Sequence, residues 1–135
     1  MGSYNLFLDD ERQPLTVFNM TGNRIYLDEK WSVARNYDSF CFLLKANHFH
    51  GNIPKIISLD HDLADEHYKH GSKSGFKEFH YSEVTEKTGL HCAKFMCDYF
   101  FENKIAFPEI LVHSMNPIGK ENIIGYINSF KQHHK

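Results

Sequence analysis

The chain has few cysteines and no long apolar run. Its 135 residues include three cysteines, and none of them belongs to a CxxC pair. Thiols used in this way are typical of small core residues in a reducing compartment and do not suggest a disulfide framework. No apolar stretch approaches the ~20 residues that a membrane-spanning helix needs, and no signal peptide is recognisable. The sequence therefore predicts a cytoplasmic protein without a membrane partner.

The chain also has little net charge, with a formal value of −2. Such a balance gives no general attraction to polyanions, so we do not expect a DNA duplex as a partner. Hydrophobic residues make up 41% of the chain and include 12 phenylalanines and 7 tyrosines, which favours a globular fold over disorder. The length suits one hydrophobic core, and we expect a single domain over residues 1–135.

A short apolar run after Pro54 ends in the triplet Asp60, His61 and Asp62. The run predicts a strand over Lys55–Leu59 that is buried on both faces. Open parallel sheets bind their ligands at the carboxyl edge, where this triplet would emerge. Two acids and an imidazole are costly to bury unpaired, so we expect them to face a metal, a cationic ligand or water. The alternative is a solvated loop whose aspartates cap a helix.

A second acidic group follows the apolar run Tyr4–Leu8, which predicts another buried strand. Asp9 and Asp10 are adjacent carboxylates that repel each other, and a divalent cation relieves such repulsion. A charged turn is the alternative for this group alone. Because two acidic strand ends would meet at one sheet edge, the sequence predicts an oxygen-rich Mg²⁺ or Mn²⁺ site that also includes Asp60.

Residues 15–30 are rich in turn signals and predict an irregular hairpin that covers part of the sheet. Alternation over Trp31–Arg35 then predicts a short strand. Arg35 at its end could hold a phosphate by bidentate hydrogen bonds or pair with an aspartate. Asn36 is a suitable N-cap for a helix that extends to about His48.

Residues 63–87 form a long polar stretch, which is typical of a functional lid or of a solvated segment. Its histidines, with His91, match no zinc-site spacing. Thr88 is a good N-cap for the next helix, and the N–H groups at that start, from Gly89 onward, can bind an anion.

The last buried run, Ile110–Val112, leads into His113, Ser114 and Asn116. Asn116 is a plausible N-cap, and Pro117 fits the first helical position. The three polar residues would then lie at the same sheet edge as the acids. Local turn chemistry is the alternative, and it explains part of the role of Asn116.

Strands alternate with helices, and each strand ends in polar residues. This pattern predicts a three-layer α/β fold with a parallel sheet of about four strands in the order 2-1-3-4. The first strand lacks a clear helix after it, which is irregular for such a fold.

Five motifs occur along the chain in a fixed order. They are Leu-Asp-Asp-Glu-Arg with a nearby proline, Trp…Ala-Arg-Asn-Tyr-Asp, Ile-Ser-Leu-Asp-His-Asp-Leu, Thr-Gly before a helix, and His-Ser-Met-Asn-Pro-Ile-Gly. Together they resemble the cyclic-phosphate processing receiver-like domains, a divergent branch related to response-regulator receivers. The resemblance covers nearly the whole chain. It implies a receiver-like, flavodoxin-type fold that is truncated relative to a full receiver.

The resemblance also implies roles for individual residues. Asp9 and Asp10 match the acidic metal-binding pair, and Asp60 matches the phospho-accepting aspartate of receivers. Further polar positions that mark this branch are matched by His61, Asp62, His113, Ser114 and Asn116. The family is inferred to act on cyclic or terminal phosphates, in RNA repair or nucleotide signalling. The missing lysine and final strand of an ordinary receiver argue against two-component signalling.

We therefore expect a metal-dependent phosphoesterase or phosphatase that acts on a cyclic or terminal phosphate of a nucleotide or RNA end. Asp60 would bind the metal or attack phosphorus itself. His61 and His113, with Asp62, are the acid–base candidates, because an imidazole pKa lies near working pH. The groups expected to contact phosphate are Arg12, Arg35, Thr88, Gly89, Ser114 and Asn116. The alternative is a nucleotide-phosphate binding module or phospho-receiver without turnover.

Overall fold

The computed structural model describes residues 2–63 and 87–134. The stretch predicted over residues 63–87 to be a functional lid or a solvated segment lies, except for its first and last residues, outside these described residues. Within the two described ranges, no helix combines the length and the apolar character that a membrane span requires.

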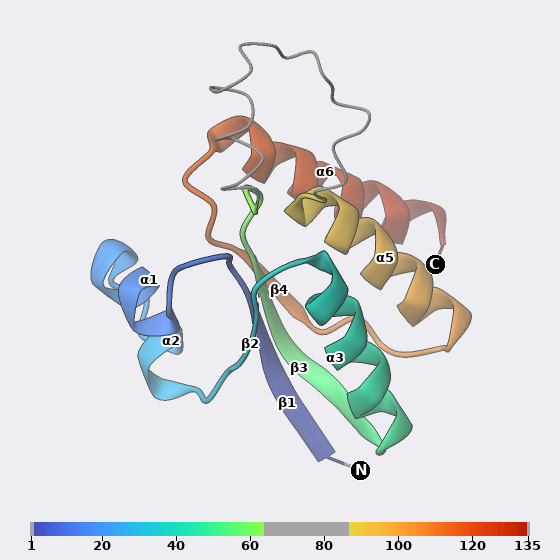
Figure 1. Ribbon diagram of the computed structural model, residues 1–135. Helices are drawn as coiled ribbons and strands as arrows, with labels where there is room; N and C mark the ends of the chain where they lie inside the picture. The colour runs from blue at the N-terminus through green and yellow to red at the C-terminus, as the bar shows by residue number, and fades with distance from the viewer. Residues whose placement is uncertain (1, 64–86, 135) are drawn as a thin grey trace, which may run out of the picture.

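Four parallel strands form one sheet in the order β2-β1-β3-β4, which confirms the predicted order. The strands are β1 (Gly2–Leu8), β2 (Ser32–Ala34), β3 (Asn52–Leu59) and β4 (Glu109–Val112). Since all four run in the same direction, their carboxyl ends meet at one edge, which is at the top of Figure 1. The polar residues that follow the strands are therefore gathered along that edge.

Helices cover both faces of the sheet, so the three-layer α/β fold is confirmed (Figure 1). Leu6 and Leu8 point into the larger core cluster, whereas Phe7 points into a smaller one on the other face. This alternation follows from the two-residue period of a strand. The larger core lies under α3 (Tyr37–Phe49), α5 (Gly89–Glu102) and α6 (Pro117–His133). The smaller one lies under α1 (Pro14–Thr21) and α2 (Ile25–Asp28).

The three predicted helix starts are confirmed by their caps. The side chain of Asn36 accepts a hydrogen bond from the N–H of Ser39 at 2.8 Å, at the start of α3. Thr88 caps α5, and Asn116 caps α6, whose first residue is a proline. Each cap satisfies an N–H group that the first helical turn leaves without a partner.

The hairpin predicted over residues 15–30 is wrong, because this segment forms α1 and α2. A proline at the first position favours the start of α1, and Gly22, with φ +76°, ends it in the left-handed conformation. With 8 and 4 residues, the two helices are too short for an apolar period to stand out. The segment does cover the sheet, since Val17 and Tyr26 pack with Phe7.

Pro54 does not bound the third strand but lies inside it. It stands opposite Tyr4, and the pairing with β1 shifts register immediately after that residue. An irregularity in the ladder tolerates a residue without an N–H group, which explains why the strand begins earlier than predicted.

Gly89 allows the start of α5 to lie directly against the end of β3. A methyl group added there would overlap the backbone oxygen of Asp60 and lie 2.8 Å from its carbonyl carbon. We expect Gly89→Ala to lower the free energy of unfolding by about 3 kcal/mol, because backbone cannot move aside cheaply. Gly125→Ala in α6 is the matched control. Its added methyl meets nothing within 4 Å, and a gain of up to about 1 kcal/mol is expected.

Urea unfolding of both variants measures the difference. Equal effects at the two glycines would show that the close approach at Gly89 is unimportant.

Candidate functional site

The carboxylate of Asp9, directly after β1, is fully buried and accepts four hydrogen bonds. Its Oδ1 accepts from the backbone N–H groups of Glu11, at 3.0 Å, and Arg12, at 2.9 Å. Its Oδ2 accepts from Nη1 of Arg12 and from Nε2 of His113, both at 3.1 Å. A carboxylate offers about four lone-pair sites, so Asp9 uses its whole capacity within the protein.

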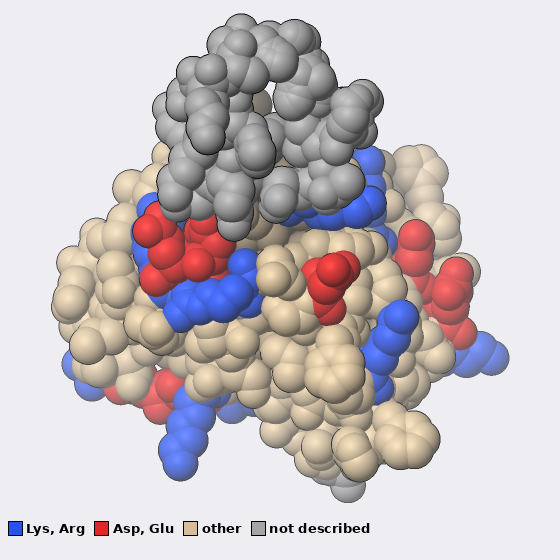
Figure 2. Space-filling view, in the orientation of Figure 1, with Lys and Arg blue, Asp and Glu red and all other residues tan. Residues whose placement is uncertain are grey.

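Asp60, directly after β3, is the second buried carboxylate and is 3% exposed. Its Oδ1 accepts the N–H of His61 at 2.9 Å. Its Oδ2 lies 3.7 Å from Nη1 of Arg12, which also pairs with Asp9. The Arg12 guanidinium therefore stands between the two carboxylates. Figure 2 shows acidic and basic side chains next to one another on the upper left of this face, near the loop that follows β1.

The two carboxylates have very different proton affinities. Burial raises the pKa of Asp60 to about 7, and the neighbouring charge of Asp9 adds to this effect, against the opposing effect of Arg12. Burial also acts on Asp9, but hydrogen bonds from His113 and from the N–H groups of Arg12 and Glu11 outweigh it and bring its pKa to about 2. Near neutral pH, Asp9 is ionised, while Asp60 is divided between its two forms.

His113 belongs to a buried chain of hydrogen bonds. The Tyr26 hydroxyl lies 2.6 Å from Ser58 Oγ, and Ser58 Oγ lies 2.7 Å from His113 Nδ1. On the other side of the ring, Nε2 contacts Asp9, and the imidazole stacks on Phe7 with centroids 4.6 Å apart. Burial lowers the pKa of His113, which favours the neutral ring.

The ionised state of Asp9 fixes the direction of every hydrogen bond in this buried series. An ionised carboxylate only accepts, so Nε2 of His113 must carry the proton. Nδ1 of the neutral ring is then an acceptor, so Ser58 donates to it. The Ser58 oxygen in turn accepts from Tyr26. His113 therefore has both ring nitrogens engaged, and its role as a general acid or base stays a prediction.

A second group forms on the outer side of Asp60. Nδ1 of His61 lies 2.9 Å from Oδ1 of Asp62, and the Asn116 side chain donates to the same oxygen at 3.3 Å. Because the carboxylate accepts, it holds the proton of His61 on Nδ1 and leaves Nε2 as the basic nitrogen. Gly119 makes room for this ring, since an added methyl group would overlap its Cγ and lie 2.7 Å from Nδ1.

Some of the residues predicted to contact phosphate already form hydrogen bonds with other groups of the protein. Nη1 of Arg35 donates to the backbone oxygens of Asp9, at 3.0 Å, and Arg12, at 2.7 Å, and so supports the loop after β1. At the start of α5, the N–H of Gly89 donates to the His61 backbone oxygen, at 2.8 Å, and the Thr88 side chain accepts from the N–H of Leu90, at 3.2 Å. Their roles toward phosphate stay predictions.

The segment after β4 is explained partly by turn chemistry. Ser114 is buried, and its Oγ accepts the N–H of Asn116 at 3.1 Å. The Oδ1 of Asn116 caps α6, while its side-chain nitrogen contacts Asp62. Asn116 therefore joins the end of β4 to the loop after β3, as its predicted place at the sheet edge requires.

Among the described residues, Asp9, Asp60 and His113 offer donor atoms that all lie within 4.8 Å of one another, a spacing that a metal ion could use. Asp10 is not part of this group. Mg²⁺ and Mn²⁺ prefer oxygen ligands with free lone pairs. Asp9 has none left, and Nη1 of Arg12 contacts both carboxylates. This arrangement does not fit a divalent cation until existing contacts break, and the predicted Mg²⁺ or Mn²⁺ stays a prediction.

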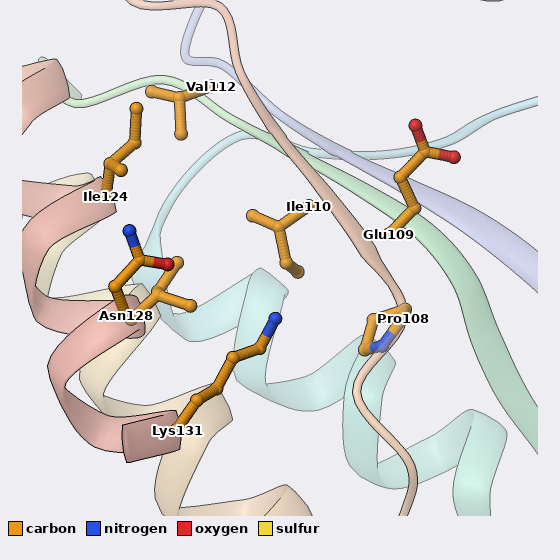
Figure 3. A pocket seen from close by; sticks show the side chains of 8 residues that line it. Pro108, Glu109, Ile110, Val112, Ile124, Asn128 and Lys131 are labelled. Carbon is orange, nitrogen blue, oxygen red and sulfur yellow. The ribbon is translucent and has the colours of Figure 1, made fainter.

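A separate hollow of about 220 Å³ lies between β4 and α6 (Figure 3). Its lining includes Ile110, Val112 and Ile124, together with Lys131. None of the acids or histidines at the sheet edge lines it, so it is distinct from the candidate site.

Sequence reasoning missed Tyr26, Ser58 and Gly119. Ser58 gave a usable signal, because it is a lone polar residue inside the apolar run of β3. Gly119 stands in the first turn of α6. The sequence does not show whether a glycine there makes room for the ring of another residue or is an ordinary small residue. Tyr26 gave no usable signal in the sequence, since α2 itself was not expected.

The raised pKa of Asp60 predicts a specific pH dependence of stability. Its carboxyl keeps its proton in the native state at pH values where the unfolded chain, with an ordinary pKa of 3.8, has lost it. The native state then binds more protons, so the free energy of unfolding falls as pH rises from about 4 to 7. Asp60→Asn removes this loss. Its stability relative to wild type should rise by roughly 2 to 4 kcal/mol between pH 4 and 8.

Urea unfolding in EDTA across this range provides the measurement, with the exposed Asp28→Asn as the control. Parallel pH profiles for wild type and Asp60→Asn would contradict the raised pKa.

The hydrogen-bond chain predicts the tautomer of His113. Long-range ¹H–¹⁵N spectra near pH 7 should show its proton on Nε2. Ser58→Ala removes the donor to Nδ1 and should cost about 1 to 3 kcal/mol, because a buried acceptor is left unpaired. Tyr26→Phe keeps that donor and should cost less. A proton found on Nδ1 of His113 would reverse the assigned direction of the chain.

Comparison with known proteins identifies the family. A profile of the cyclic-phosphate processing Receiver domain matches residues 4–129. The match includes all the residues of both groups at the sheet edge. A search of curated proteins found no match, and neither did a search of solved structures. The chain belongs to the cyclic-phosphate processing receiver domain family.

Proposed function

We propose that this domain is a phosphoesterase that opens or removes a cyclic or terminal phosphate of a nucleotide or RNA end. The observation that carries the proposal is the placement of Asp60 and Arg12 beside the hydrogen-bonded pair His61 and Asp62. Membership of a family of cyclic-phosphate processing domains supports the same substrate class.

Arg12 is the proposed phosphate-binding group. Its side chain is 28% exposed, so a ligand can reach it, and its Nη1 is held by the Asp9 carboxylate. A guanidinium presents a planar fork of donors that matches two phosphate oxygens and the negative charge that they carry. Asp9 is thus a positioning residue, since it acts on the substrate through Arg12.

His61 is the proposed general base. Asp62 holds its proton on Nδ1, so Nε2 is available to take a proton from a water molecule. The water oxygen forms a bond to phosphorus while the bond from phosphorus to the ribose oxygen breaks. That oxygen then receives a proton. Asp60 can supply it, because its pKa of about 7 keeps part of the carboxyl protonated near neutral pH.

This division of roles uses only groups that the structure brings together. The product of a cyclic substrate is a terminal phosphomonoester. Attack on phosphorus by Asp60, acid–base catalysis by His113, a bound Mg²⁺ or Mn²⁺ and a cytoplasmic location stay predictions from the sequence.

The test is turnover of 2′,3′-cyclic, 3′-terminal and 5′-terminal nucleotide phosphates, with EDTA, Mg²⁺ or Mn²⁺. Products are identified by ³¹P NMR, which shows which bond is cleaved. We expect Asp60→Asn and His61→Gln to lose activity by roughly 100-fold or more, as is usual when a proton-transfer group is removed. Asp28→Asn and His133→Gln, both exposed, are the matched controls.

Turnover that survives in both site variants would reject the proposed roles. A phosphoryl group found on Asp60 without turnover would support the alternative phospho-receiver, which the position of Asp60 at the end of β3 favours. Binding of the panel without any chemistry would indicate a nucleotide-phosphate binding module.

A further inference from the structure

We infer that Arg12 is the resident cation of the Asp9 and Asp60 carboxylates, and that a divalent cation binds this pair only by displacing its guanidinium. This inference goes beyond the proposed function, because it concerns cation binding and does not require turnover. It makes the site a place where an internal cation and an external one compete.

The contacts of Arg12 support the first part. Its Nη1 lies 3.1 Å from Oδ2 of Asp9 and 3.7 Å from Oδ2 of Asp60. Both side chains are nearly without solvent, at 0% and 5% exposure. Two carboxylates this deeply buried repel each other unless a positive charge lies near both. One nitrogen of Arg12 supplies that charge.

The differing nature of the four partners of Asp9 supports the second part. A cation that bound Asp9 would need one of its four lone-pair sites, and two of these are taken by backbone N–H groups. A third is taken by His113, which is stacked on Phe7 and hydrogen-bonded to Ser58. The fourth is taken by the Arg12 side chain, which is long and 28% exposed. Arg12 is the partner that can leave with the least disruption.

Removal of Arg12 should therefore raise the affinity for a divalent cation. The two carboxylates would lose their internal counter-ion, and a lone pair on Asp9 would become free. Charges about 4 Å apart near a protein surface interact by several kcal/mol before solvent screening, so a tenfold gain, about 1.4 kcal/mol, is a conservative expectation.

The experiment measures binding of Mn²⁺ alone, without any phosphate compound, at pH 8. Free Mn²⁺ is followed by electron paramagnetic resonance, and Trp31 fluorescence gives a second signal. Trp31 is the single tryptophan of the chain, and it stacks on Tyr26 with ring centroids 5.5 Å apart. We expect Arg12→Ala to bind Mn²⁺ at least about tenfold more tightly than wild type.

Two further variants give the controls. Arg24→Ala removes the same charge from an exposed ion pair with Asp28 and should bind Mn²⁺ as wild type does. The double variant Arg12→Ala, Asp60→Asn should lose the gain, which places the ion at this pair. Arg12→Gln replaces Arg12→Ala if thermal unfolding shows that the alanine variant is not folded.

Unchanged or weaker Mn²⁺ binding in the Arg12 variant would overturn the inference, as would an absence of binding in both proteins. An equal gain in Arg24→Ala would reduce the effect to net charge and overturn it too. A gain that persists in the double variant would place the ion elsewhere. Failure of the turnover experiment would leave these outcomes unaffected, since none depends on a substrate.

Discussion

The buried carboxylate of Asp9 is the interaction on which the whole sheet edge depends. A charge removed from water is stable only when donors replace its hydration, and Asp9 finds four of them. They come from the loop after β1, from the Arg12 side chain and from His113 at the end of β4. The loop after β1 and the end of β4 are therefore bound together across β3, and the site has its shape before any ligand arrives.

The hydrogen bonds that Asp9 accepts also affect the proton affinity of Asp60. Each donor that stabilises the Asp9 charge keeps a negative charge beside Asp60, whose own contacts are fewer. The two carboxylates at the ends of neighbouring strands thereby acquire opposite tendencies, one to stay ionised and the other to hold a proton. Such separation of pKa values is how one site obtains groups with different chemical roles. Arg12 moderates the separation, since its charge contacts both.

The sequence was sufficient for the sheet order, the three helix caps and the place of the polar residues, because each rests on a short local pattern. Strand ends of a parallel sheet must meet, so Asp9, Asp60 and His113 could be brought together without coordinates. Their partners could not be foreseen. Whether Arg12 faces a carboxylate or a ligand depends on side-chain direction. The hydrogen bond from Tyr26 to Ser58 depends on α2, which is too short to leave a period in the sequence.

The residues that break local rules lie where the site needs them. Isoleucine and leucine fill the rest of the end of β3, yet Ser58 interrupts them and donates to His113. Glycine in a helix costs about 1 kcal/mol relative to alanine, yet Gly119 stands in the first turn of α6, against His61. Without the two histidines beside them, an apolar residue and an alanine would be the more stabilising choices at these positions. Each of the two residues is explained by its contact with a histidine of the sheet edge.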